Sequence, residues 1–132
     1  MSLLLWHCGY WYGPAANLDQ ERLRADPDTA LPPLRVRQWL NKPASMRPKV
    51  YTKELDAAQW VFNQMRNVAR HLAAADERWW SVIEAAYGDA KREILAGHDI
   101  QWGHEVPRGM AVRLAVVVEY VSKSPRTSRE SH

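Results

Sequence analysis

The sequence predicts an all-α protein, a small helical domain whose C-terminal half has an arrangement like a helix-turn-helix. Apolar side chains recur every three or four residues over 55–72 and again over 79–90, the spacing of one face of an α-helix. All eight prolines lie outside these two segments, where they interrupt regular structure. No apolar run approaches the roughly 20 residues that span a bilayer, so no membrane association is predicted.

Length and composition predict one domain. The chain has 132 residues, of which 46% are hydrophobic and 25% charged, as in ordinary globular proteins. We expect the domain to cover residues 1–121, with an aromatic and basic part over 1–52 and a helical part over 53–121. The polar residues 122–132 are expected to form a disordered tail. One cysteine allows no internal disulfide, which fits a cytoplasmic location.

The first half of the chain is expected to contain only short helices. The apolar and aromatic segment from Leu3 to Tyr12 ends at the turn signal Gly13-Pro14 and predicts one short helix. Brief helical turns are predicted over Leu18–Leu23 and Leu34–Leu40, within an otherwise irregular, proline-rich stretch.

Two longer helices are predicted in the second half. The first covers about 53–74, and the second begins after Asp76, a suitable N-cap. Gly88 either ends this second helix or lies within it at a cost of about 1 kcal/mol. If it ends there, a further short helix follows, and Gly97 suits the end of the helical stretch.

The last segment allows two structures. Residues 97–106 are predicted to form a loop, and Pro107 suits the first position of a helix over 107–121. Val112, Leu114 and the alternating apolar residues after them also fit a strand, and valine favours strands. We prefer the helix because its neighbours are helical and a lone strand would lack a partner, and the strand remains the alternative.

Charge is unevenly distributed along the chain, although the net charge is only +3. Residues 35–53 contain no acidic side chain and six basic ones: Arg35, Arg37, Lys42, Arg47, Lys49 and Lys53. Such a segment is an electrostatic footprint for a polyanion or an acidic protein surface. The alternative is a solvated basic loop.

Nothing in the sequence indicates an enzyme, and no cofactor or metal is predicted. Cys8 beside His7 would suit an activated thiol, but adjacent side chains usually point apart, so we expect a buried, inert cysteine. Four potential metal ligands lie within eight residues: His98, Asp99, His104 and Glu105. Their spacing is not that of a zinc site, and a polar loop is the preferred interpretation.

The order from Asp76 to Val121 predicts helix, short helix, loop and helix. Arg108 and Arg113 would then point away from the apolar face of the final helix, where a recognition helix presents side chains to the major groove. The alternative is a plain helical hairpin with a solvated charged face.

Four short motifs occur in order along the chain. They are the aromatic segment Leu3–Trp11, the basic Met46–Tyr51, the helix start Asp56–Met65, and Arg78–Gly88, which ends in Tyr-Gly. This order resembles the phage late-gene antitermination proteins of the Q type. The C-terminal part of those proteins is similar to the helix-turn-helix of sigma-factor region 4.

The resemblance implies a phage regulator in the host bacterial cytoplasm, without a catalytic site, that binds double-stranded DNA near a late promoter and loads onto host RNA polymerase. It assigns Arg108 and Arg113 to the recognition helix and Lys91 and Arg92 to the helix before it. The basic stretch 35–53 would contact DNA or polymerase, which predicts salt-dependent binding.

Two other functions fit the sequence. The first is a helical interaction module that binds a host protein through exposed aromatics such as Trp11, Trp39 and Trp102. The second is a small DNA-packaging (terminase small) subunit, which would form a ring. The oligomeric state is not predicted.

Overall fold

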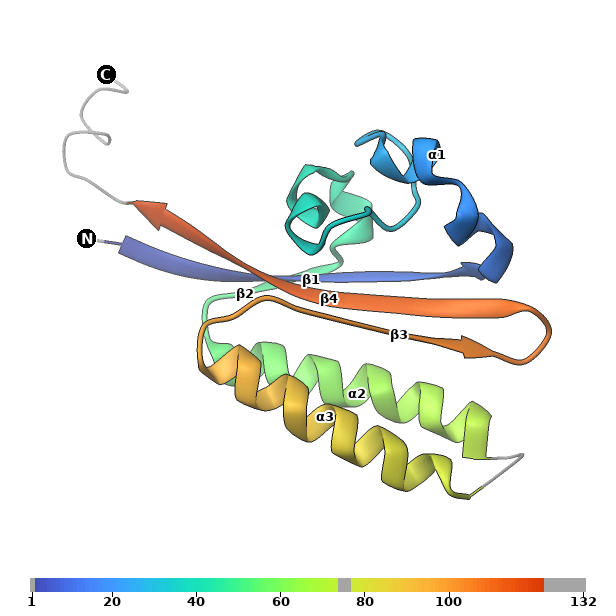
Figure 1. Cartoon of the computed structure of the whole chain (residues 1–132). Coiled ribbons are helices and arrows are strands. Elements are labelled where there is room, and N and C mark those ends of the chain that lie inside the picture. Colours follow the sequence, from blue (N-terminus) through green and yellow to red (C-terminus); the bar gives the residue numbers. More distant parts are fainter. Residues whose placement is uncertain (1, 74–76, 123–132) are drawn as a thin grey trace.

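In a computed structural model, which describes residues 2–73 and 77–122, the chain forms a mixed α/β fold. A four-stranded antiparallel sheet has two helices on one face and a largely irregular segment on the other (Figure 1). The prediction of an all-α protein is therefore wrong.

The sheet has the strand order β2-β1-β4-β3. Its strands are β1 (Ser2–Pro14), β2 (Lys49–Tyr51), β3 (Ile100–Val106) and β4 (Met110–Ser122). The two central strands pair along their whole length, whereas the outer strands cover only part of them. The beginning of β1 and the end of β4 therefore extend past β2 and β3 as a two-stranded ribbon, at the left of Figure 1.

The helices predicted over 3–12 and 107–121 are strands, and the predicted loop 97–106 is mostly β3. The central part of β4 is buried on both faces: Leu114 and Val116 face the helices, and Ala115 and Val117 face the irregular segment. A strand covered on both sides carries a continuous apolar run rather than an alternating one. The C-terminal strand β4 does have a partner, because the aromatic N-terminal segment forms β1 and pairs with it.

The two long helices are confirmed as α2 (Glu54–Ala73) and α3 (Trp79–Leu95), although Asp76 lies outside the described residues. Helix α3 runs through Gly88 without a break, and Gly97, with φ +82°, follows its end. The hairpin of β3 and β4 comes next, so no helix follows α3 and no helix-turn-helix occurs among residues 77–122.

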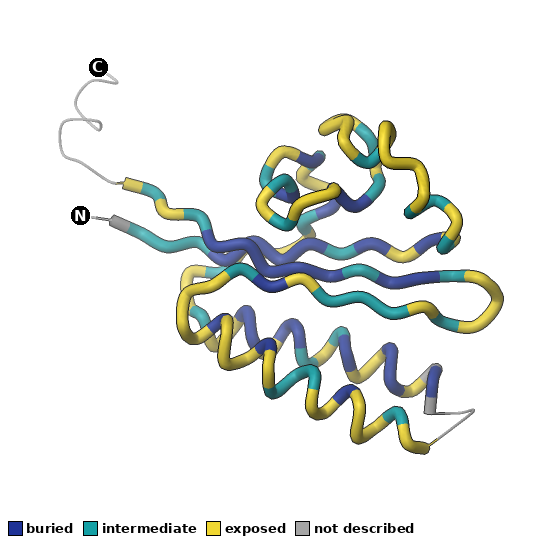
Figure 2. Tube along the Cα trace, in the orientation of Figure 1, coloured by how far each residue is buried: buried dark blue, intermediate teal, exposed yellow. Residues whose placement is uncertain are grey.

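The larger core lies between the sheet and the two helices. Fully buried side chains from β4, α2 and α3, such as Leu114, Met65 and Ile94, meet Trp6 and Cys8 of β1 there. Burying each such side chain contributes about 1.5–3 kcal/mol. Figure 2 shows the consequence, because the buried positions follow the middle of the sheet and the inner helix faces, while the outer helix faces are exposed.

A second core lies on the opposite face, under residues 15–47. This segment contains α1 (Glu21–Ala25) and three short 3₁₀ helices, Ala15–Asp19, Val36–Asn41 and Ala44–Met46. Trp39 is fully buried against Gly9, and its Nε1 donates a hydrogen bond to Gln101 Oε1 at 2.9 Å. Trp11 is also buried. The expectation that Trp11 and Trp39 are exposed is therefore wrong, because both fill this core.

Within the described ranges, no helix is both long and apolar enough to cross a membrane. Of the predicted tail, only Ser122 is described, as the last residue of β4, and residues 123–132 lie outside the description.

Candidate functional site

An open cleft lies at the hairpin end of the sheet, on its helix-covered face. It has a volume of about 660 Å³, within the roughly 300–1,000 Å³ of small-ligand pockets. We call it the tyrosine cleft, and it is lined by Tyr10, Tyr12, Asn67, Val68, Val106, Pro107, Arg108 and Val112. Helix α2, two central strands and the β3–β4 turn thus contribute to one site.

The period of two along a strand places Tyr10 and Tyr12 on the same face of β1. Tyr10 is half-buried, whereas Tyr12 is 53% exposed. Burial, together with the neighbouring Tyr12 phenol, raises the pKa of Tyr10. Tyr10 therefore keeps its hydroxyl proton at neutral pH, so it offers a hydrogen-bond donor beside an aromatic surface.

Arg108 lies in the three-residue turn between β3 and β4. Its φ is +69°, in the left-handed region that costs a non-glycine residue about 1–2 kcal/mol, and Gly109 follows with φ +72°. Arg108 is exposed and makes no ion pair or side-chain hydrogen bond with any described residue. None of the described residues that line the cleft carries a carboxylate. The site therefore combines apolar walls with one uncompensated positive charge.

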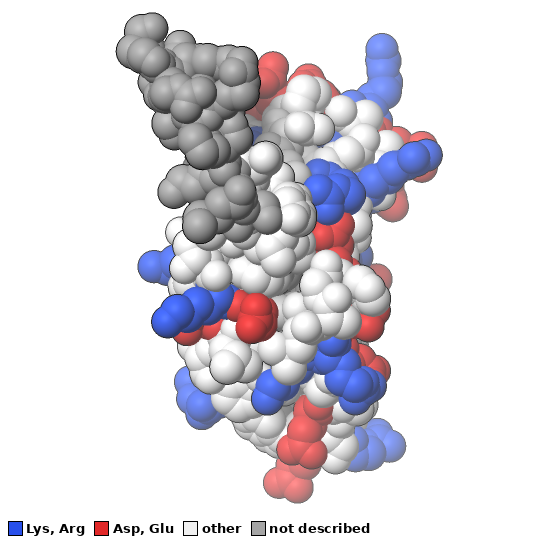
Figure 3. All heavy atoms as spheres, turned by 90° about the vertical axis from the view of Figure 1, so that its left-hand side faces the viewer, with Lys and Arg blue, Asp and Glu red and all other residues white. Residues whose placement is uncertain are grey.

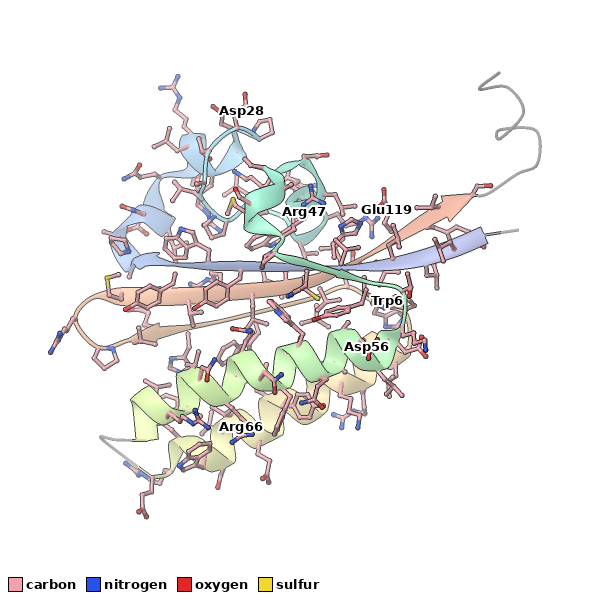
Figure 4. The ribbon with its side chains drawn as sticks, turned by 180° about the vertical axis from the view of Figure 1, so that it is seen from behind. Trp6, Asp28, Arg47, Asp56, Arg66 and Glu119 are labelled. Atoms are coloured by element: carbon pink, nitrogen blue, oxygen red, sulfur yellow. The ribbon has the colours of Figure 1, made fainter. Side chains whose placement is uncertain are left out.

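The outer side of β1 is unpaired beside this cleft. Among the described residues, β2 pairs only with Trp6–Cys8, so the stretch Gly9–Pro14 pairs with a neighbouring strand on its β4 side alone. Seen from behind in Figure 4, β2 crosses in front of β1, and no further strand lies along the rest of that edge. We call Gly9–Pro14 the open edge.

Five of the ten predicted DNA-binding residues are engaged within the protein. Lys42 is buried, and its Nζ donates hydrogen bonds to the carbonyl oxygens of Arg24 and Asp26 at 2.9 and 2.7 Å. Burial lowers the pKa of Lys42, although nearby Asp26 opposes the shift. Arg47 is directed toward the sheet as well. These two cations hold the irregular segment in place rather than presenting charge to a ligand.

Three more of the ten are engaged within the protein. Arg37 donates to Asp99 Oδ2 at 2.9 Å and to the Val118 carbonyl at 3.1 Å. The side chain of Arg113 packs on Gly103, because a Cβ added to Gly103 would lie 2.4 Å from the Cδ of Arg113. Arg92 pairs with Asp89 on the surface of α3.

The remaining five, Arg35, Lys49, Lys53, Lys91 and Arg108, are exposed on separate elements. In the view of Figure 3, basic and acidic side chains are interspersed, and no face of one sign appears.

Sequence reasoning missed a polar network under the irregular segment. His7 is buried between two charged groups, since Arg47 Nη1 donates to its Nδ1 at 3.0 Å and its Nε2 donates to Glu119 Oε1 at 2.8 Å. Figure 4 shows Arg47 and Glu119 on the same side of the sheet. Because both ring nitrogens of His7 are occupied, neither is available as a general base, and the network joins β1, β4 and the irregular segment.

Cys8 and His7 point to opposite faces of the sheet, as expected for neighbours in an extended chain. Cys8 is fully buried, and burial raises the pKa of its thiol from 9.0 to about 12. The expectation of a buried cysteine is therefore confirmed, and its inertness stays a prediction that the raised pKa favours.

The polar residues of 98–105 do not converge. His98 contacts Glu93 at 3.4 Å, Asp99 binds Arg37, and His104 Nδ1 donates to the Glu105 carbonyl at 2.7 Å. No group of three metal-ligating side chains occurs in the part of the chain that the structure describes.

Comparisons of the chain with models of protein families, with curated proteins and with solved structures find no match. The resemblance to the antitermination proteins therefore stays a prediction, and its helix-turn-helix is not present in the described fold.

Proposed function

We propose that this protein is an interaction module that binds a segment of a partner protein in the tyrosine cleft, without catalysing a reaction. The observation that carries the proposal is the lining of the cleft. Two tyrosines, four apolar side chains, one asparagine and the exposed Arg108 meet there, and none of these described lining residues is acidic. Such a surface complements a segment that carries an apolar side chain and an acidic one.

The composition of the cleft favours a protein over duplex DNA. Tyrosine and arginine are enriched among the residues that dominate the energetics of protein interfaces. Affinity for duplex DNA instead depends on several phosphate contacts made together. Among the residues that the structure describes, one cation lines the cleft, and the other exposed basic side chains named above lie on different elements.

The backbone of Arg108 supports the same site. A strained residue that the surrounding structure keeps in place is often found where a ligand binds. Glycine or asparagine would occupy φ +69° at lower cost. An arginine at this position places a long cationic side chain at the cleft, where we expect it to pair with the partner's carboxylate.

Selection from a display library of random peptides tests the proposal. We expect the protein to enrich peptides that contain an acidic residue close to an apolar one. Tyr12→Ala and Arg108→Asn should each reduce their binding by about tenfold or more. Trp80→Ala is the matched control, because Trp80 is an exposed aromatic on α3 outside the cleft.

The proposal fails if no peptide is enriched by folded protein, or if Trp80→Ala reduces binding as much as the two cleft variants do. Binding to double-stranded DNA or to host RNA polymerase stays a separate prediction. A salt-dependent mobility shift with promoter DNA that is lost on charge reversal of Lys49 and Lys53 would support the DNA-binding prediction instead.

A further inference from the structure

The open edge differs from the outer edge of β3, which is also free of a strand partner. Proteins commonly protect exposed strand edges with charged side chains, prolines or short strands. The outer edge of β3 has such protection, with polar side chains at Gln101, His104 and Glu105. The first five residues of the open edge, Gly9 to Gly13, contain no charged side chain and no proline.

We infer that the partner segment binds as an extended strand, antiparallel or parallel to β1, along the open edge from Gly9 to Pro14. This inference rests on the proposed function, since it describes how the segment in the tyrosine cleft is held. The occupant is a peptide of alternating apolar and acidic side chains.

The position of β2 supports strand addition. β2 already pairs with β1 over Trp6–Cys8 on this same side, and it begins at Lys49 opposite Cys8. An added strand would lie in line with β2 and beside the next residues of β1. The backbone groups of β1 that point outward there would gain partners, which is the main source of affinity in strand addition.

The cleft determines the chemistry of the added strand. Every second side chain of the strand would point to the helix-covered face, beside Tyr10 and Tyr12. Two exposed cations flank this region, Lys49 at the start of β2 and Arg108 in the β3–β4 turn. Acidic side chains on the face that points into the cleft therefore complement the site, and basic ones oppose it.

The test uses a capped synthetic peptide of about six residues, the usual strand length, in which valine and glutamate alternate. A peptide with lysine in place of glutamate is the charge control. Amide hydrogen exchange of the full chain, followed by NMR, reports on β1 residue by residue.

We expect the glutamate peptide to slow exchange at every second amide between Gly9 and Gly13, while amides on the outer edge of β3 keep their rates. The lysine peptide should bind at least about tenfold more weakly than the glutamate peptide. In an added strand, every second N–H of the peptide faces β1 and the others face away. N-methylation of the nitrogens that face β1 should therefore abolish binding, and N-methylation of the others should leave it nearly unchanged.

Failure of strand addition is distinguishable from failure of the cleft. If the peptide shifts the Tyr10 and Tyr12 resonances but protects no alternate amides of β1, or if both N-methylation patterns are tolerated, strand addition is wrong and the cleft proposal stands. If the peptide leaves the tyrosines and the amides unchanged, both are wrong. Protection of the same amides in a dimer formed without peptide would assign the edge to a second copy and overturn the inference.

Discussion

Two parts of β1, its covered half Trp6–Cys8 and its open half Gly9–Pro14, differ in what surrounds them, and both follow the ribbon residues Ser2–Leu5. Trp6–Cys8 lies between β2 and β4, with Trp6 and Cys8 in the helix-side core and His7 held by Arg47 and Glu119. The open edge Gly9–Pro14 has a strand on one side only, and Tyr12 is 53% exposed. One continuous strand thus stabilises the fold over its covered half and leaves hydrogen-bonding groups and aromatic surface available over the other.

The largest effect that this difference predicts is on stability. Trp6→Ala removes a side chain that is 4% exposed and should lower the free energy of unfolding by about 3–5 kcal/mol. Tyr12→Ala, in the open half of the same strand, should change it by less than about 0.5 kcal/mol. Chemical denaturation of both variants measures the contrast, and equal losses would show that the two halves are not distinct.

The boundary between the halves is Gly9, where the irregular segment packs on the sheet. A Cβ there would lie 2.5 Å from Cε3 of the fully buried Trp39, a rigid ring, so Gly9→Ala should destabilise the protein by about 1–3 kcal/mol. The control is Gly88→Ala in α3, where an added Cβ meets nothing within 4 Å. This substitution should stabilise the protein by about 0.5–1 kcal/mol. A neutral Gly9→Ala would contradict the observed packing.

The covered half also predicts a dependence on alkaline pH. The pKa of Cys8 is about 12 in the folded state and 9.0 when exposed, so unfolding releases a proton between these values. The stability that the protonated thiol contributes is complete below pH 9 and decreases as the pH rises toward 12. The slope from this one group is at most about 1.4 kcal/mol per pH unit.

Denaturation of the wild type and of Cys8→Ala between pH 9 and 10 isolates this contribution, since other groups titrate in both proteins. The wild type should lose more stability over the interval. Native Cys8 should also resist thiol reagents at pH 8, and rapid modification of folded protein would show that it is accessible.

In the cleft, a small effect on stability accompanies a large effect on binding. Arg108→Gly relieves a positive φ and should stabilise the protein by about 1 kcal/mol while weakening peptide binding. Arg108→Asn should also tolerate this conformation and serves as the matched variant. Thermal unfolding and a peptide titration measure the two effects, and a destabilised Arg108→Gly would mean that the side chain supports the turn.

The sequence predicted the helices of the fold better than its strands. The periodicity over 55–72 identified α2 within a residue at each end, because one face of that helix is buried and the other is exposed. The central parts of β1 and β4 are covered on both faces, so their apolar runs are nearly continuous and fit a helix as well as a strand. The five valines of β4 did favour a strand, but its partner lies about 100 residues away, and such pairing is not visible in local patterns.

The candidate site was predicted only in part. Arg108 was expected to bind a ligand from a helix, and it lies instead in a turn that brings it to the cleft. The tyrosines were missed because only a strand places Tyr10 and Tyr12 on one face, and that segment was expected to be helical. The acid-free run 35–53 suggested one basic surface, yet Lys42 and Arg47 are directed inward, where carbonyl oxygens and His7 accept their hydrogen bonds.

Calorimetric titration of the valine–glutamate peptide into three proteins tests the central claim most directly. The proteins are the wild type, the Trp80→Ala control and the double variant Tyr12→Ala with Arg108→Asn. We predict that the wild type and the control bind the peptide equally and that the double variant binds at least about tenfold more weakly while remaining folded. Equal binding by all three, or no binding by the wild type, would contradict the account.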